Sequence, residues 1–408
     1  MITIKKIYLE DFHNPSGGGI GTRLICEIDT NGKKDTLFLE CEQKWKKYLL
    51  AERADAFVVL LLPVAMREKH DIISYLPITE ALKNNLEKDY IPTLCQNDKT
   101  LYAPKIFAET ENALIGGTAV GTANSLGVDS FYTIYKYGNC EDENLRITHF
   151  YMGAISLDLW RTHSKNIFQY LKKKKYIFDR YKLVADELGK ELILTFSNFI
   201  KFMCKKHGYV HTTVHTYITL AEILCFKKLW KAYLFSATFG PKDVSIQNVR
   251  HTDCSHYDYL TTQALSVPDL KIISSGAEVS RYEKTKILAD YEAAQKYLRP
   301  CFNYLQLRKD MKNCGRSLCP KCLRLLVSAD VAGNLDKFKN VVDVEKYKRH
   351  RKRFFRIVVW GRNRSPFLRE LYGYCKEKYP KQIKSLDRFK NFITFHWKKP
   401  KSEEKTKA

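Results

Sequence analysis

From Asn112 onward, short apolar segments alternate with amphipathic segments, and this alternation constrains the fold more than any other feature of the chain. Short apolar runs are typical of buried strands, whereas apolar residues spaced by three and four are typical of helices. Strands that alternate with helices form a parallel sheet covered by helices on both faces. We therefore expect an α/β domain over residues 112–338. Strands are expected at 114–123, 147–152, 192–196, 233–236 and 271–274, and helices at 181–189, 220–228 and 281–297.

The residues before this domain predict a small α+β N-terminal domain, residues 1–111. Alternating and continuous apolar runs favour strands, and longer amphipathic runs favour helices. We expect strands at 2–12, 22–29, 35–40 and 56–64, and helices near 41–52 and 78–88.

The last residues, 339–408, form a basic C-terminal extension. The net charge of the chain is +24. Residues 345–408 alone carry 21 Lys and Arg against 6 Asp and Glu. Aromatic residues interleave with the cations at 346–356, as in surfaces that follow a phosphate backbone and stack bases. A solvated amphipathic helix and a docking surface for an acidic carrier protein remain alternatives.

Composition also bears on location. The longest apolar run, 56–66, falls short of the roughly 20 residues that a membrane span needs. The N-terminus has no secretory signal pattern, so we expect a cytoplasmic protein without a membrane partner. In a reducing compartment, the twelve cysteines are thiols or metal ligands before they are disulfides.

One turn carries the chemistry of phosphate binding. Ser-Leu-Gly-Val-Asp-Ser, residues 125–130, lies between an expected strand and an expected helix, where unpaired N–H groups and the helix dipole attract anions. Gly127 permits close backbone approach, Ser125 and Ser130 offer hydroxyls, and Asp129 suits a Mg²⁺ ion that bridges phosphates. A plain helix cap is the alternative.

This turn resembles the Ser-Gly-Gly-x-Asp-Ser signature of the PP-loop ATP pyrophosphatases, with Leu126 in place of the first glycine. Asn-Cys-Gly-Arg (313–316) and Lys-Cys-Leu-Arg (321–324) are similar to a zinc-associated branch of that family, which includes 7-cyano-7-deazaguanine synthase and thioamide-forming enzymes of biosynthetic clusters. The resemblance implies a PP-loop/HUP-like fold and a loop that grips the pyrophosphate of ATP.

Two further elements resemble that branch. Ser-Arg-x-x-Lys (280–284) places Arg281 and Lys284 one helical turn apart, so that both can face one anion. A solvated helix face is the alternative. Asn198, at the end of an expected strand, lies where ligand crevices form in parallel sheets, so we expect it to contact the nucleotide.

Four clustered cysteines predict a zinc site. Cys301, Cys314, Cys319 and Cys322 supply the four thiolates of a closed tetrahedral site, which favours a structural Zn²⁺. Buried free thiols are the alternative.

Other potential ligands are interpreted differently. His207, His211 and His215 recur every four residues, but the intervening Thr and Val favour extended structure or a loop, which would break their alignment on a helix. We interpret them as surface or substrate-pocket histidines. His251, Cys254 and His256 precede the last strand, where a substrate loop can lie.

Together these observations predict an enzyme that uses ATP and Mg²⁺ to adenylate a carbonyl, amide or carboxylate oxygen, which sulfur or nitrogen then replaces. AMP and pyrophosphate leave, and thioamide formation in a biosynthetic pathway is the favoured outcome. The substrate is a small or carrier-tethered molecule. A tRNA- or nucleobase-modifying enzyme is one alternative. A zinc-bearing nucleic-acid-binding protein with a degenerate loop is another.

Overall fold

The computed structural model describes residues 1–14, 19–112, 116–153, 164–300 and 320–397, with the side chains of the last helix described as far as Phe389. Contacts divide the chain into two compact units, residues 1–280 and 281–408. The three-part division expected from motifs at 1–111, 112–338 and 339–408 stays a prediction.

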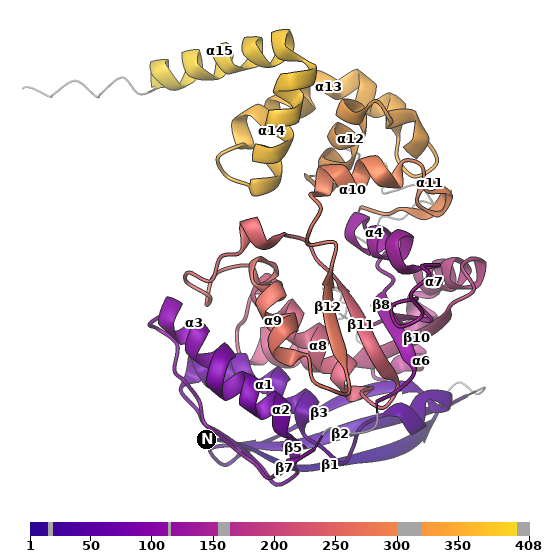
Figure 1. Ribbon diagram of the computed structural model, residues 1–408, viewed down its shortest axis with the longest axis vertical. Helices are drawn as coiled ribbons and strands as arrows, with labels where there is room; N and C mark the ends of the chain where they lie inside the picture. The colour runs from indigo at the N-terminus through magenta and orange to yellow at the C-terminus, as the bar shows by residue number, and fades with distance from the viewer. Residues whose placement is uncertain (15–18, 113–115, 154–163, 301–319, 398–408) are drawn as a thin grey trace, which may run out of the picture. The chain divides into compact units, whose positions relative to one another are not determined.

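The first unit is built on a ten-stranded sheet with the order β12-β11-β8-β9-β10-β3-β2-β1-β4-β6 (Figure 1). Its strands are β1 (Ile2–His13), β2 (Ile20–Thr30), β3 (Lys33–Glu42), β4 (Ile72–Ser74), β6 (Ile106–Phe107), β8 (Ala119–Ala123), β9 (His149–Met152), β10 (Glu191–Ser197), β11 (Trp230–Ser236) and β12 (Lys271–Ser275). Two further short strands, β5 (Ile78–Thr79) and β7 (Thr110–Glu111), pair with each other.

Five strands from β8 to β12 are all parallel, and β8 lies in the middle. The chain builds β8, β9 and β10 in one direction and then returns to place β11 and β12 on the other side of β8. Right-handed crossovers in such a sheet put the two sets of helices on opposite faces. Figure 1 shows α4 and α7 on one side of these strands and α9 and α1 on the other. The expected α/β fold with a mainly parallel sheet is confirmed.

The strands of the N-terminal residues belong to the same sheet. The antiparallel meander β1-β2-β3 joins the parallel strands through β3, which pairs antiparallel with β10 at Thr195↔Cys41 and Ser197↔Leu39. The expected strands at 2–12, 22–29 and 35–40 are therefore present and extend the sheet.

The helices of the first unit follow its strands along the chain. They are α1 (Asp55–Glu68), α2 (Glu80–Asn84), α3 (Ile91–Asn97), α4 (Val128–Tyr137), α6 (Ile167–Lys173), α7 (Lys175–Glu187), α8 (His215–Cys225) and α9 (Asp258–Leu265). Short 3₁₀ or π turns are η1 (Gln43–Tyr48), η2 (Asn85–Tyr90), η3 (Lys201–Lys206), η4 (His211–Thr213), η5 (Pro241–Asp243) and η6 (Cys254–His256).

The strand expected at 56–64 is wrong, because these residues form helix α1. Every residue from Asp55 to Met66 is buried, and the helix packs against α8. A helix that is apolar all round shows no 3.6-residue periodicity, so a continuous apolar run cannot distinguish it from a buried strand.

Two further expected helices are corrected, and one is confirmed. Residues 41–52 contain only the 3₁₀ turn η1. The helix expected at 78–88 is present, because α2 and the π turn η2 cover residues 80–90 after the short strand β5. Residues 281–297 form two helices, α10 (Arg281–Leu288) and α11 (Glu292–Tyr297).

The described part of the second unit is helical. It contains α10, α11, α12 (Pro320–Ala332), the turn η8 (Leu335–Phe338), α13 (Val344–Gly361), α14 (Pro366–Lys378) and α15 (Pro380–Trp397). Helices α12, α13 and α14 pack against one another around buried residues that include Leu326, Phe354 and Leu371. No described helix combines the length and the apolar content needed to cross a membrane.

Candidate functional site at the carboxyl edge of the parallel strands

The position of residues 124–130 follows from the strand order. β8 ends at Ala123. From β8 the chain continues to β9 and β10 on one side, whereas from the other neighbour, β11, it continues away to β12. In open parallel sheets, ligands bind outside the carboxyl ends of the strands at such a reversal point. The turn that the sequence singles out therefore lies where a ligand crevice is expected.

The backbone of this turn has an unusual conformation at Leu126. Its φ is +59°, in the left-handed region that favours glycine, and its side chain is fully buried. Gly127 follows in extended conformation, with φ −78° and ψ 170°, and caps α4. Leu126 stands where the Ser-Gly-Gly-x-Asp-Ser signature has its first glycine, and its backbone has the conformation that glycine favours.

Two serines hold the turn. Ser130 is buried, its hydroxyl donates to the carbonyl of Ala123, and the N–H of Ser125 donates to the Ser130 Oγ at 3.3 Å. Ser125 is exposed, and its Oγ accepts from the N–H of Gly127 at 3.3 Å. Ser130 therefore positions the turn in this structure, while Ser125 is the hydroxyl on its outer side.

Helix α4 is fixed above the ends of β11 and β12 by hydroxyl groups. Thr133 Oγ1 lies 2.9 Å from Ser236 Oγ, at the end of β11, and 3.0 Å from Ser275 Oγ, at the end of β12. The first helical bond is donated by the Phe131 N–H to the Gly127 carbonyl. The half-buried Asp129 lies in the first turn of this helix.

The backbone of the turn is open at Gly127. A Cβ added to Gly127 meets only Ser125 Oγ, at 3.3 Å, within 4 Å, so nothing else in the described chain crowds the backbone here. Asn124 is fully buried next to the turn, and its Oδ1 has no hydrogen-bond partner among the described residues. An amide oxygen accepts hydrogen bonds and so does not itself favour a phosphate. The feature that suits an anion here is the N-terminus of α4 beside the open backbone of Gly127.

Asn198 has a different environment. Its Oδ1 accepts from the Phe38 N–H at 2.9 Å, and its Nδ2 donates to the Thr36 carbonyl at 2.8 Å. The carboxamide thus continues the pairing between β10 and β3. These bonds give Asn198 a structural role, and they provide no support for the expected nucleotide contact.

Arg281 and Lys284 open helix α10 in the second unit. Lys284 is 1% exposed, and the guanidinium of the half-buried Arg281 lies 4.7 Å from the ring centre of Phe367. Neither residue lies on a solvated helix face. Their contact with an anion stays a prediction.

The four-cysteine cluster is described only at Cys322, which is buried on α12. Cys301, Cys314 and Cys319 lie outside the described residues. The structural zinc site therefore stays a prediction.

A second group of potential ligands was missed by sequence reasoning. His215 at the start of α8, Asp253 and Cys254 place their ligand atoms within 4.8 Å of one another. His215 Nε2 lies 3.3 Å from Asp253 Oδ1. Burial alone favours the neutral imidazole, but the Cys254 sulfur and Asp253 raise the pKa of His215 above its ordinary value. Burial likewise favours the neutral Asp253, but hydrogen bonds from His215 and Ser255 lower its pKa.

The structure places His207, His211 and His215 in three different elements. His207 follows the π turn η3 and contacts Glu68 Oε1 at 2.7 Å, His211 begins a 3₁₀ turn, and His215 begins α8. The three do not share a helix face. The expectation that these residues are not aligned on one helix is confirmed, yet His215 joins Asp253 and Cys254. The one available signal was that both segments follow carboxyl ends of core strands.

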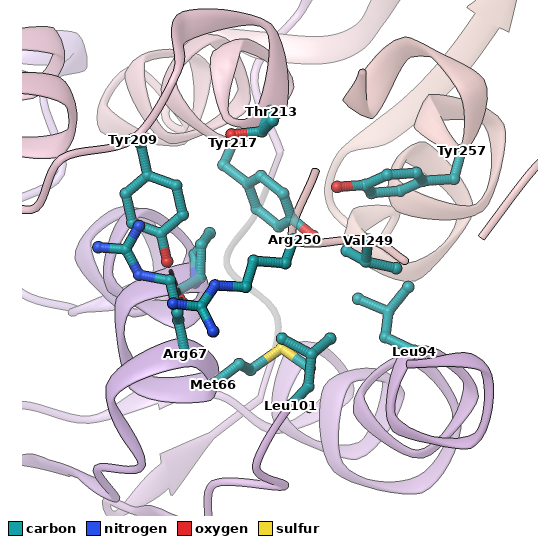
Figure 2. A pocket seen from close by; sticks show the side chains of 11 residues that line it. Met66, Arg67, Leu94, Leu101, Tyr209, Thr213, Tyr217, Val249, Arg250 and Tyr257 are labelled. Carbon is teal, nitrogen blue, oxygen red and sulfur yellow. Dashed lines mark hydrogen bonds between the residues drawn. The ribbon is translucent and has the colours of Figure 1, made fainter. Parts of the chain in front are cut away.

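The segments that supply this group also line a small cavity of about 20 Å³ (Figure 2), enough for a single water molecule. Figure 2 shows Tyr209, Tyr217 and Tyr257 along one side and Met66 and Leu101 on the other. This cavity is too small for a substrate, so we interpret it as a packing gap between side chains.

Comparison of the chain with protein-family models, with curated proteins and with solved structures gave no match. The functional assignment therefore depends on the geometry of the site and on the motifs.

Proposed function

We propose that this protein is an ATP-dependent enzyme of the PP-loop type, which binds the pyrophosphate portion of ATP at residues 125–130 and releases AMP and pyrophosphate. One observation carries the proposal. The turn follows the central strand β8 at the reversal point of five parallel strands, and it leads directly into the N-terminus of α4.

Each residue of the turn has a distinct role in this proposal. The backbone at Gly127 and the first turn of α4 bind phosphate oxygens, and Ser125 donates its exposed hydroxyl. Ser130 positions the turn through Ala123. Asp129 holds the Mg²⁺ that neutralises the phosphates, which is the chemistry this ion supplies when it is bound.

The reaction is activation of a carbonyl, amide or carboxylate oxygen by adenylation, followed by attack of a sulfur or nitrogen nucleophile. Arg281 and Lys284, which open α10 in the second unit, are proposed to bind an anion. Thioamide formation on a small or carrier-tethered substrate fits the resemblance to biosynthetic-cluster enzymes. A cytoplasmic location is supported by eight described cysteines that are free thiols: Cys26, Cys41, Cys95, Cys140, Cys204, Cys225, Cys254 and Cys375.

Pyrophosphate release tests the proposal. Wild-type protein incubated with Mg-ATP and candidate acceptor substrates should form AMP and pyrophosphate in equal amounts. Asp129→Asn, which keeps the shape of the side chain but removes its charge, should lower the rate by roughly tenfold or more.

Gly127→Ala tests whether a phosphate of ATP approaches the backbone at Gly127. The added methyl group meets only Ser125 Oγ, so folding should be preserved while a phosphate is displaced. The matched control is Gly373→Ala in α14, where an added Cβ has no neighbour within 4 Å. Phosphate and ADP as the products, or equal ATP affinity in Gly127→Ala and wild type, would contradict the proposal.

A polyanion partner is supported by α13. Its exposed face carries Arg349, Lys352, Arg353 and Arg356, none of which has an ion pair with a described acidic residue. We propose that this face binds an acidic carrier protein or RNA. Stimulation of pyrophosphate release by tRNA would favour a nucleobase-modifying enzyme, whereas RNA binding without any ATP turnover would favour a binding protein with a degenerate loop.

A further inference from the structure

His215, Asp253 and Cys254 bring together the three kinds of side chain that bind borderline metal ions. They offer one imidazole, one carboxylate and one thiolate, and these ligand atoms lie within 4.8 Å of one another. Zn²⁺ is bound by this combination at metal–ligand distances of about 2.0–2.3 Å. Only small side-chain movements would bring all three atoms to such distances.

The group is held from two directions. Cys254 Sγ accepts from the Thr216 N–H at 3.4 Å and lies 3.2 Å from Thr216 Oγ1, in the first turn of α8. Asp253 Oδ1 accepts from the N–H of Ser255 at 3.0 Å and from its hydroxyl at 2.6 Å. Outer partners of this kind orient metal ligands and stabilise their ionised forms.

The burial of the three ligands is graded. Cys254 is fully buried, whereas the side chains of His215 and Asp253 are 25% and 41% exposed. A cation between them is therefore enclosed on the sulfur side and open to solvent on the carboxylate side. Three protein ligands with one open position is the arrangement of catalytic rather than structural zinc sites.

We propose that His215, Asp253 and Cys254 form a second zinc site, distinct from the four-cysteine cluster, with its fourth position open to a water or substrate atom. The two negative ligands offset the charge of the ion. The alternative is a hydrogen-bonded His–Asp pair beside a structural cysteine. That alternative does not explain why a thiol, an imidazole and a carboxylate, which together bind cations, lie next to one another.

The place of the proposed zinc site in the sheet suggests a role for its open coordination position. η6 and the start of α8 both follow carboxyl ends of parallel strands, as the 125–130 turn does. An ion at this edge can polarise the oxygen of a carbonyl substrate or hold a water or sulfide nucleophile. This use rests on the proposed function, but metal binding itself does not.

Metal content of the full-length protein gives the first test. Wild type should contain two zinc ions per chain, one in each site. The Cys314→Ser/Cys319→Ser variant should retain one. Replacement of that remaining ion by Co²⁺ should give a thiolate-to-cobalt charge-transfer absorption that comes from Cys254.

Single changes in that background identify the ligands. Cys254→Ser should abolish the charge-transfer absorption, and His215→Gln and Asp253→Asn should each weaken Co²⁺ binding by at least roughly tenfold. His256→Gln and Cys95→Ser are the matched controls. His256 contacts the Asp243 carbonyl at 3.0 Å, and Cys95 lies on α3, so neither should change binding.

Folding is monitored by circular dichroism, because Cys254 is fully buried and its change can disturb the core. His215→Gln and Asp253→Asn lie on the exposed side and decide the question if Cys254→Ser does not fold. A folded Cys314→Ser/Cys319→Ser protein without metal and without the cobalt absorption would overturn the site. Because these readouts need no ATP, a failed pyrophosphate assay with metal bound would count against the proposed function alone.

Discussion

At the scale of single residues, Leu126 shows two opposing effects at one position. Its left-handed backbone costs about 1–2 kcal/mol relative to glycine. Its buried side chain contributes more, because removing a buried leucine typically costs about 2–5 kcal/mol. The leucine therefore stabilises the turn despite its strain, and the departure from the Gly-Gly pattern is explained by packing.

Two substitutions separate these effects. Leu126→Gly should lower the free energy of unfolding by about 1–3 kcal/mol, because lost burial exceeds the relieved strain. Leu126→Ala should lower it by about 1 kcal/mol more, since alanine loses the burial and keeps the strain. Urea unfolding measures both variants. A glycine variant as stable as wild type would show that strain, rather than burial, dominates.

Among the helices, α1 and α13 show how burial determines the pattern of apolar residues along a helix. α1 is apolar all round because α8 and the sheet enclose it. In α13 the buried side is apolar and the exposed side is cationic. Phe354 and Phe355 are 1% exposed, so these two rings pack in the helical unit and are not available to stack bases.

The exposed aromatic residues near this face are different ones. Trp360 and Phe389 are 37% and 47% exposed, and the guanidinium of Arg356 lies 5.9 Å from each ring centre. Cations beside accessible rings can bind a phosphate backbone and its bases together.

Neutralising the α13 face should therefore weaken polyanion binding. Replacing Arg349, Lys352, Arg353 and Arg356 with Gln should lower RNA affinity and reduce the slope of log affinity against log salt by about 3. Fluorescence anisotropy at several salt concentrations measures the slope. Gln at the exposed Lys33, Lys34, Lys172 and Lys182 removes the same charge elsewhere. Equal slopes for the two variants would show that only net charge matters.

At the scale of the whole first unit, a buried ion cluster joins the N-terminal residues to the parallel strands. Lys227 Nζ lies 2.8 Å from Asp55 Oδ2 and 3.1 Å from Asp269 Oδ2, and it donates to Thr79 Oγ1 at 2.7 Å. All three charged side chains are at most 2% exposed. The cluster connects α1 and β5 to the segments that precede β11 and β12.

Lys227→Met should destabilise the first unit by about 3–5 kcal/mol, because it removes the cation that lies between two buried carboxylates. Lys228→Met is the matched control, since its ion pair with Glu52 is largely exposed and should be worth no more than about 1 kcal/mol. Denaturant unfolding compares the two. Partial rescue of Lys227→Met by Asp269→Asn would assign the loss to the unpaired charge, and equal effects of the two lysines would contradict this account.

Features that depend on neighbouring residues could be predicted from the sequence alone. Alternation of strand and helix predicted the parallel strands β8 to β12, and the residue types at 125–130 predicted a turn before a helix. These features follow from local periodicity and backbone preference, which a short stretch of chain carries on its own.

Contacts between distant segments depend on the tertiary structure. It made residues 55–68 a helix, joined β3 to β10, and brought His215 to Asp253 and Cys254, which follow it by 38 and 39 positions in the chain. Burial from all sides removes the periodicity that distinguishes helix from strand. A contact between such distant residues leaves no periodic trace in either segment, because it arises from packing after the sheet has formed.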